Sequence, residues 1–139
     1  KVMHTTEYLL ESDKKLEFEA PEGTTVTYHD PCRLGRQMGI YEEPRKLIDQ
    51  VDNVDLVEME HTGEDALCCG VSSMMSCNEN SKMLRVTRFE EAKNTGAELM
   101  LTSCPKCVSH FECLKFEGDP RHDVEILDVV SFLAQQLKN

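Results

Sequence analysis

Five of the seven cysteines in this chain fall into three short clusters. The clusters read His29-Asp30-Pro31-Cys32, Cys68-Cys69-Gly70 and Cys104-Pro105-Lys106-Cys107, which gives the spacing C-x35-C-C-G-x34-C-P-x-C. Thiolates gathered from distant parts of a chain are the ligands that soft metal ions and iron–sulfur clusters prefer. The pattern therefore predicts a fold that brings three separate segments to one place.

Composition narrows the chemistry and the partners. Seven cysteines cannot all pair within one chain, and 139 residues are enough for one domain with a core that needs no disulfides. We therefore expect metal binding or thiol chemistry in a reducing, cytoplasmic setting. The net charge of −11 would repel nucleic acids and anionic lipids, and no apolar run reaches the roughly 20 residues of a membrane span.

Short β-branched stretches alternate with segments of helical periodicity. Strands are predicted over residues 24–28, 54–59, 99–102 and 124–127. Helices are predicted over residues 5–12, 44–51, 78–95, 105–114 and 128–137. The strand–helix order predicts an α/β fold: a parallel sheet of about four strands with helices on both faces. The cysteine clusters then lie at the C-terminal edge of the strands, where such sheets bind ligands.

Several residues are expected to begin or end these elements. Thr5 or Thr6 is a candidate N-cap of the first helix, residues 78–81 offer caps for the third, Asp128 is a candidate N-cap of the last, and Gly96 is a candidate C-cap. The turn signal Pro21-Glu22-Gly23 separates an N-terminal helix and linker, residues 1–23, from a single domain, residues 24–139. Because the sequence begins with Lys rather than Met, we expect it to be the C-terminal part of a longer protein.

Apolar positions define the expected inner faces of the helices. These positions are Leu47, Ile48 and Val51 in the second helix, Met83, Val86, Phe89 and Ala92 in the third, Val108, Phe111 and Leu114 in the fourth, and Val129, Phe132, Leu133 and Leu137 in the last.

Each motif has more than one reading. The pair Cys104 and Cys107 is compatible with a redox dithiol, a zinc knuckle or an iron–sulfur ligand pair. Adjacent Cys68 and Cys69 can both be ligands only if the loop turns sharply, which Gly70 would permit. Cys113 is predicted to pack as a small apolar residue within a helix, and the role of Cys77 stays open. Met74 and Met75 are soft side chains for which loop packing is the default expectation.

Four polar residues beside the first cysteine are candidates for a supporting role: His29, Asp30, Arg33 and Arg36. We expect His29 and Asp30 to order the loop rather than to be ligands. Arg33 and Arg36 can offset the negative charge of bound thiolates, hold an anionic substrate or simply face solvent.

The motifs Thr-Tyr-His-Asp-Pro-Cys, Cys-Cys-Gly and Ser-Cys-Pro-x-Cys, in this order, resemble those of the cysteine-rich CCG domain family. That family includes the B and D subunits of heterodisulfide reductase, the E subunit of succinate:quinone reductase, and iron–sulfur subunits of glycolate, lactate and glycerol-3-phosphate oxidising enzymes. The resemblance covers residues 24–138. Val71 to Met75 depart from the small residues that often follow Cys-Cys-Gly, which favours the heterodisulfide reductase branch.

The resemblance implies a noncubane four-iron (4Fe-4S) cluster held by Cys32, Cys68, Cys69, Cys104 and Cys107. It implies an electron-transferring oxidoreductase of several subunits or domains, most consistent with heterodisulfide reduction, in which an isolated fragment is inactive. The implied partners are ferredoxin-like iron–sulfur, flavin or membrane cytochrome subunits, with the domain on the cytoplasmic side of any membrane complex and not inserted in the membrane.

Three alternatives remain from the sequence. The first is an iron–sulfur subunit of a glycolate, lactate or glycerol-3-phosphate oxidising complex. The second is a structural zinc site in an interaction domain, since some copies of the CCG module hold zinc. The third is a metal-free dithiol oxidoreductase that uses Cys104 and Cys107, which leaves the other three clustered cysteines without a role.

Overall fold

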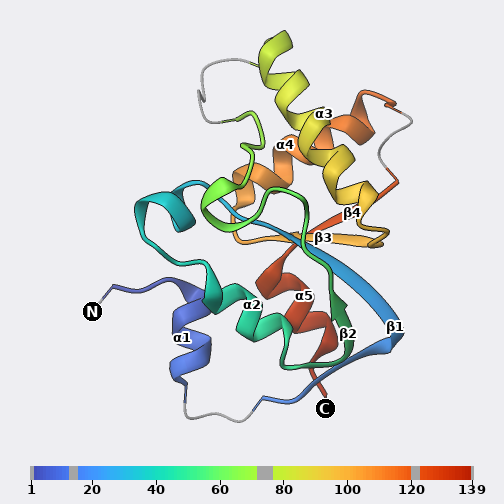
Figure 1. The fold of residues 1–139 in the computed structure, drawn as a ribbon. Coiled ribbons are helices and arrows are strands. Elements are labelled where there is room, and N and C mark those ends of the chain that lie inside the picture. The colour runs from blue at the N-terminus through green and yellow to red at the C-terminus, as the bar shows by residue number, and fades with distance from the viewer. Residues whose placement is uncertain (1, 13–15, 72–76, 120–122, 139) are drawn as a thin grey trace.

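The structure, a computed structural model, describes residues 2–12, 16–71, 77–119 and 123–138. Strands and helices alternate through these residues in the predicted order (Figure 1). The strands are β1 (Phe18–His29), β2 (Val51–Leu56), β3 (Leu99–Thr102) and β4 (Glu125–Asp128). The helices are α1 (Thr5–Glu11), α2 (Glu42–Ile48), α3 (Glu79–Asn94), α4 (Pro105–Phe116) and α5 (Val129–Gln136). Short helical turns at Arg33–Gln37 and Gly63–Asp65 lie in the connections.

The four described strands form one sheet in the order β2-β1-β3-β4. Every pair in it is parallel, with Val26 opposite Leu56 in β2 and His29 opposite Thr102 in β3. The predicted parallel α/β sheet is therefore confirmed. Parallel strands need crossover connections, and here helices supply them.

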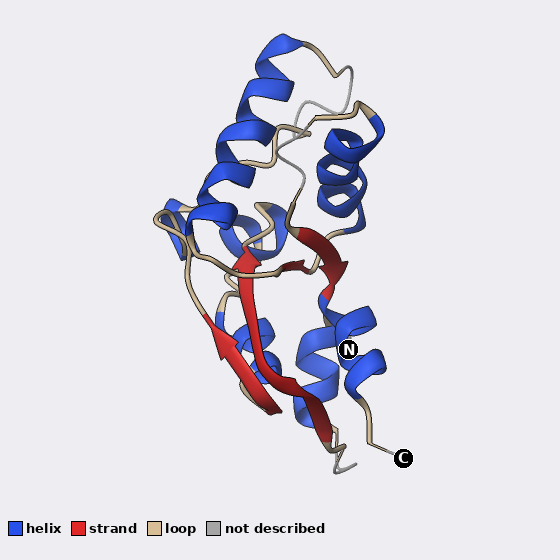
Figure 2. Ribbon diagram, turned by 90° about the vertical axis from the view of Figure 1, so that its right-hand side faces the viewer, coloured by secondary structure: helices blue, strands red, loops and turns tan. Residues whose placement is uncertain are grey.

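Helices cover both faces of the sheet and bury a separate apolar cluster on each face (Figure 2). On one face α2 and α5 pack against the strands through Leu47, Phe132 and Leu133, and α1 packs against α2. On the other face α3 and α4 contribute Phe89, Phe111 and other residues to the second cluster. Figure 1 shows these two groups of helices on opposite sides of the strands.

The predicted helix boundaries are largely present. The Asn78 side chain accepts a hydrogen bond from the Ser81 amide at the start of α3, and the Asp128 side chain accepts from the Val130 amide at the start of α5. Gly96 follows α3 with a φ of 77°, as the left-handed C-cap requires. The prediction of Thr5 or Thr6 as the cap of α1 is wrong, because the His4 side chain accepts from the Thr6 amide and takes that position.

The first strand is longer than predicted. It begins at Phe18, and the Pro21-Glu22-Gly23 signal causes an irregularity in the β1–β2 pairing instead of a turn that precedes the strand. Gly23 has a φ of 80°, which lets the chain bulge and continue. The boundary that we expected after residue 23 thus falls inside β1.

Three apolar positions lie elsewhere than predicted. Val51 starts β2, opposite Phe18, because α2 ends at Ile48, so β2 also begins and ends earlier than expected. Met83 is 62% exposed and Leu137 is 45% exposed, so neither belongs to an inner helical face. None of the helices in the described ranges combines the length and apolar character needed to cross a membrane.

Candidate metal centre

The first and third cysteine clusters follow neighbouring strands. Cys32 lies three residues beyond the end of β1, and Cys104 lies two residues beyond the end of β3. From β1 the chain runs to β2 on one side, whereas β3 pairs with the other side of β1. The connections that leave β1 and β3 therefore diverge, and a parallel sheet binds ligands in the crevice at such a point.

The second cluster reaches this crevice through the loop that follows β2. Arg36 holds the loop, because its guanidinium donates to the backbone carbonyls of Glu64 and Ala66. Gly70 has a φ of 94°, and a Cβ atom there would lie 2.3 Å from the carbonyl oxygen of Ser81. The sharp turn expected at Gly70 is present, and only glycine fits it. This turn places the Cys69 side chain in the interior, where it packs with residues of α4 in the second apolar cluster.

Four of the five proposed ligands line one cavity of about 180 Å³. They are Cys32, Cys69, Cys104 and Cys107, and the lining also includes Pro31, Arg33, Gln37, Val71 and Lys106. The sulfur atoms of Cys69 and Cys107 lie 3.3 Å apart. Cys68 is not part of this lining. Its sulfur accepts a hydrogen bond from the Gly70 amide at 3.3 Å, and its side chain forms a hydrogen bond with that of Cys69.

The cysteine side chains differ in their readiness to lose a proton. Hydrogen bonds from Cys107, Cys68 and His29 lower the pKa of Cys69, and donation by Cys107 to Cys104 and Cys69 raises its own pKa. The bond from Cys107 and the backbone amides at the start of α4 lower the pKa of Cys104 to about 6. Cys69 and Cys104 are therefore the cysteines of this site that lose a proton most readily.

His29 lies at the end of β1, inside the molecule. One of its ring nitrogens lies within 4.8 Å of the sulfurs of both Cys69 and Cys107. Its Nδ1 accepts a hydrogen bond of 3.0 Å from Nε of Arg88. Burial lowers the pKa of His29, so the imidazole is neutral at neutral pH.

Asp30 fixes the backbone that leads to Cys32. Its carboxylate accepts two hydrogen bonds from Arg45, of 2.7 and 2.8 Å, and a third from the Gly63 amide at 2.9 Å. Burial alone would raise the pKa of Asp30, but these hydrogen bonds outweigh it and lower the pKa. Arg45 also binds Glu58 through two hydrogen bonds of 2.6 and 3.0 Å. This ion pair joins α2, the end of β1 and the loop toward Cys68.

The remaining candidates are placed as follows. Arg33 lines the thiol cavity, while Arg36 is engaged with the loop carbonyls. Cys113 lies in α4, half-buried, and its sulfur donates to the Ser109 carbonyl at 3.3 Å. Cys77 is exposed just before α3. Met74 and Met75 lie outside the described residues.

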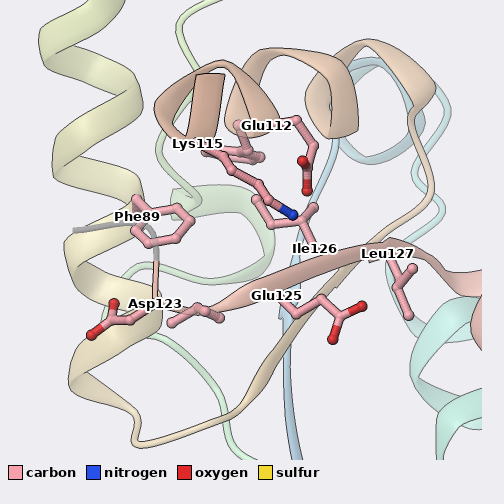
Figure 3. Close-up of a pocket in the computed structure, with 9 residues that line it drawn as sticks. Phe89, Glu112, Lys115, Asp123, Glu125, Ile126 and Leu127 are labelled. Carbon is pink, nitrogen blue, oxygen red and sulfur yellow. The ribbon is translucent and has the colours of Figure 1, made fainter. Parts of the chain in front are cut away.

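A larger cavity, of about 530 Å³, lies where α3 and α4 face the edge strand β4. Figure 3 shows Glu112, Lys115, Asp123 and Glu125 at this cavity together with the Phe89 ring. No cysteine is among its described lining residues, so it offers none of the thiol chemistry of the smaller cavity.

Sequence reasoning missed three functional neighbours of the cysteines. Arg88 binds His29 and Arg45 binds Asp30, and both arginines are distant in sequence from these partners. An arginine among residues expected to face solvent gives no signal of such a pairing. Lys106 was visible within the C-P-K-C motif, where a cation between two thiolates is itself a signal.

The lining of the thiol cavity fits a soft metal or an iron–sulfur cluster. It offers four cysteine sulfurs and, in the described residues, no carboxylate, which excludes the oxygen-rich set that Mg²⁺ and Ca²⁺ prefer. Arg33 and Lys106 supply positive charge beside the thiolates. The thiolates at Cys69 and Cys104 are the form that binds metal.

Comparison with known protein families gives one match. A family model described as a cysteine-rich domain, CCG, matches residues 26–112, which include every cysteine of the three clusters. No solved structure matches the chain.

Several curated proteins are similar over almost the whole chain. The D subunit of the dihydromethanophenazine:CoB–CoM heterodisulfide reductase from Methanosarcina acetivorans is 34% identical over 98% of the chain. The probable iron–sulfur-binding oxidoreductase FadF from Bacillus subtilis is also 34% identical over 98%, and the EtfAB:quinone oxidoreductase from Syntrophomonas wolfei is 27% identical over 99%. The chain spans 34%, 20% and 21% of the lengths of these three relatives.

Proposed function

Since the chain belongs to the cysteine-rich CCG domain family, we propose that it is an iron–sulfur domain that transfers electrons within an oxidoreductase. Cys32, Cys68, Cys69, Cys104 and Cys107 would hold the cluster. The observation that carries this proposal is the convergence of thiols from three loops on one cavity whose described lining has no carboxylate. When bound, an iron–sulfur cluster accepts and donates single electrons.

The proposed cluster is of the noncubane four-iron type. The number of thiols supports this choice, because a structural zinc ion is satisfied by four ligands whereas the three motifs deliver five. Cys68 would be the fifth; it does not line the cavity, but its side chain hydrogen-bonds that of Cys69, which does.

The proposed reaction is reduction of a disulfide of the heterodisulfide reductase type. The similarity to three Methanosarcina heterodisulfide reductase D subunits, at 29–34% identity, supports it. In such a reaction the disulfide takes up two electrons and two protons and becomes two thiols. The electrons would come from a partner redox domain or subunit, such as a ferredoxin-like, flavin or cytochrome component.

A related alternative is electron transfer without disulfide chemistry. The similarity to FadF and to the EtfAB:quinone oxidoreductase favours it, because these names describe iron–sulfur binding and quinone-linked oxidoreduction. The iron–sulfur subunits of hydroxy-acid or glycerol-3-phosphate oxidising complexes belong to the same class of function.

A structural zinc site is the alternative of a different class. It is favoured by one observation: potential ligand atoms of His29, Cys69 and Cys107 lie within 4.8 Å of one another. With Cys104 these residues would give a four-ligand nitrogen and sulfur set of the kind that zinc binds.

Metal analysis of the anaerobically prepared chain tests the proposal. The chain is expressed with iron and sulfide supplied, and iron, acid-labile sulfide and zinc are measured alongside the absorption and electron paramagnetic resonance (EPR) spectra. We expect iron and sulfide in equal amounts, close to four of each per chain for the proposed cluster. A chain that holds one zinc ion and no iron under these conditions would decide for the structural alternative.

The reaction is tested separately on the loaded chain. Addition of CoB–CoM heterodisulfide to the loaded chain should change its EPR spectrum, and the two thiols alone should leave it unchanged. If the disulfide has no effect and the cluster still exchanges electrons with a quinone-linked flavoprotein, electron transfer without disulfide chemistry is the better description.

A further inference from the structure

His29 lies between the guanidinium of Arg88 and the sulfur of Cys69. On one side its Nδ1 is 3.0 Å from Nε of Arg88. On the other side the imidazole hydrogen-bonds the Cys69 side chain, and because Nδ1 is occupied, Nε2 is the nitrogen left for this contact. The ring of Phe111 packs edge-on against the imidazole, with centroids 5.1 Å apart, so the ring plane is fixed as well.

Arg88 is itself held in one position. Its side chain is 0% exposed, and its Nη1 donates to the His61 carbonyl at 2.7 Å and to the Glu91 carboxylate. Burial lowers the pKa of Arg88, and the bond to Glu91 opposes this effect. Arginine is protonated in proteins at neutral pH, so its Nε carries a hydrogen and can only donate.

This arrangement determines the position of the proton on His29. Because Nε of Arg88 only donates, Nδ1 of His29 must be an unprotonated acceptor. An imidazole whose Nδ1 is unprotonated is neutral and carries its single proton on Nε2, the nitrogen that remains for Cys69. The contact with Cys69 is therefore N–H to sulfur, with His29 as the donor.

The same arrangement argues against His29 as a ligand. A metal-bound histidine uses the lone pair of one ring nitrogen and donates the N–H of the other to an acceptor. Here the group that faces Nδ1, Nε of Arg88, is itself a donor. A metal bound at Nε2 would therefore require the imidazole to lose its only proton and become an anion. The proximity of His29 to the two sulfurs has another explanation, namely the hydrogen bond.

We propose that His29 is a positioning residue that donates an Nε2–H hydrogen bond to the sulfur of Cys69, that Arg88 fixes this tautomer, and that His29 does not bind metal. The hydrogen bond holds the Cys69 sulfur in place in the metal-free chain and stays with it when the site is loaded. The tautomer is independent of the cluster, whereas the effect on reduction potential below rests on the proposed function. Hydrogen bonds to cluster sulfurs stabilise the reduced form and raise the potential.

The tautomer is measured directly on the reduced, metal-free chain of 139 residues. Long-range proton–nitrogen NMR spectra of ¹⁵N-histidine-labelled protein at neutral pH distinguish a protonated from an unprotonated ring nitrogen. We expect Nδ1 of His29 to be unprotonated and Nε2 to be protonated. A proton on Nδ1, or on both nitrogens, would overturn the proposal whether or not the chain binds iron.

Two substitutions of His29 in the loaded chain distinguish a hydrogen-bond donor to Cys69 from a metal ligand. The amide nitrogen of glutamine can occupy the place of Nε2, whereas that of asparagine is too short to reach it. We expect both His29→Gln and His29→Asn to keep the wild-type iron and sulfide content. The reduction potential should stay near wild type in His29→Gln and move to a more negative value in His29→Asn.

His4→Asn is the matched control, since this histidine caps α1, which packs against α2 on the face of the sheet opposite to Cys69 and Cys107. It should change neither iron content nor potential. Loss of iron in both His29 variants, with iron retained in the control, would show that His29 is a ligand. Equal potentials in all variants would show that it only packs. If wild type holds zinc alone, the proposed function fails while the NMR result still decides the tautomer.

Discussion

The backbone of α3 lies so close to Gly70 that no side chain would fit at this position. Its φ is 94°, and a Cβ would meet the backbone carbonyl of Ser81 at 2.3 Å and the His110 ring at 3.2 Å. Left-handed backbone costs alanine about 1–2 kcal/mol, and forced overlap in a packed region costs about 1–3 kcal/mol more. At the residue scale, the position of the Cys-Cys pair thus depends on an absent side chain.

Gly70→Ala should lower the free energy of unfolding by about 2–5 kcal/mol and reduce metal uptake. The matched control is Gly96→Ala. Gly96 has a φ of 77°, but no atom lies within 4 Å of the added Cβ, so this variant should lose only the free energy that a left-handed backbone costs alanine. Urea denaturation of the two variants measures the difference. Equal losses in both would contradict the proposed contact with Ser81.

The two cysteine classes should respond differently to substitution. Cys69→Ala removes a thiolate from the cavity and should abolish the cluster spectrum while the circular dichroism changes little. Cys113→Ser should keep the iron content, because its sulfur bonds a helix carbonyl and does not line the cavity. Iron analysis of both variants checks this, and loss of iron in Cys113→Ser with an intact fold would make the ligand assignment wrong.

At the scale of elements, α2 is joined to the site by the Arg45–Asp30 ion pair. The Asp30 side chain is almost fully buried and the Arg45 side chain is 12% exposed. Removal of one partner from a buried pair costs about 3–5 kcal/mol, because the other charge stays buried without compensation. The position of the loop that carries Cys32 therefore depends on a helix that contributes no ligand.

Arg45→Met should accordingly lower the free energy of unfolding by about 3 kcal/mol or more. The double variant Asp30→Asn/Arg45→Met should be less destabilised than the sum of the two single variants, since the buried position 30 then carries no charge without a partner. A double-mutant cycle by urea denaturation measures this coupling. Additive losses would show that the two side chains act independently.

Helix α3 shows where sequence reasoning about an element succeeds and where it fails. Its beginning within residues 78–81, where the structure has Asn78 as the cap, and its end before Gly96 were both predicted, because capping chemistry is local. Its inner face was only half predicted: Phe89 and Ala92 are buried, but Met83 is exposed and Arg85 and Arg88 are buried. These arginines keep helical spacing with the buried apolar residues, but each also has a partner outside α3, Glu117 for Arg85 and His29 for Arg88, which a single helix pattern does not reveal.

At the scale of the whole molecule, the alternation of strands and helices was sufficient to predict a parallel sheet with the cysteine motifs at one edge. The order β2-β1-β3-β4 was not predicted, yet it is this order that makes the strands before Cys32 and Cys104 neighbours. The cavity also depends on side-chain orientation in three loops, which spacing alone cannot give. Family resemblance, rather than periodicity, supplied the proposed ligand set.

Metal loading should stabilise the whole domain, because it ties loops from three strands together. A group that binds only the folded chain adds about 2.7 kcal/mol at a free concentration of 100 times its dissociation constant. We expect a higher melting temperature for the loaded chain than for the metal-free chain in calorimetry. The increase should persist in Cys113→Ser and vanish in Cys69→Ala, and an equal increase in both variants would place the bound metal elsewhere.

Cys69 and Cys107 belong to the interior as much as to the site. Each is 3% exposed, and both pack in the same apolar cluster as Phe89, Phe111 and Leu114. A cofactor delivered after folding must therefore reach atoms that the finished interior has already enclosed. We therefore expect the folded, metal-free chain to take up iron and sulfide more slowly than a chain that refolds in their presence.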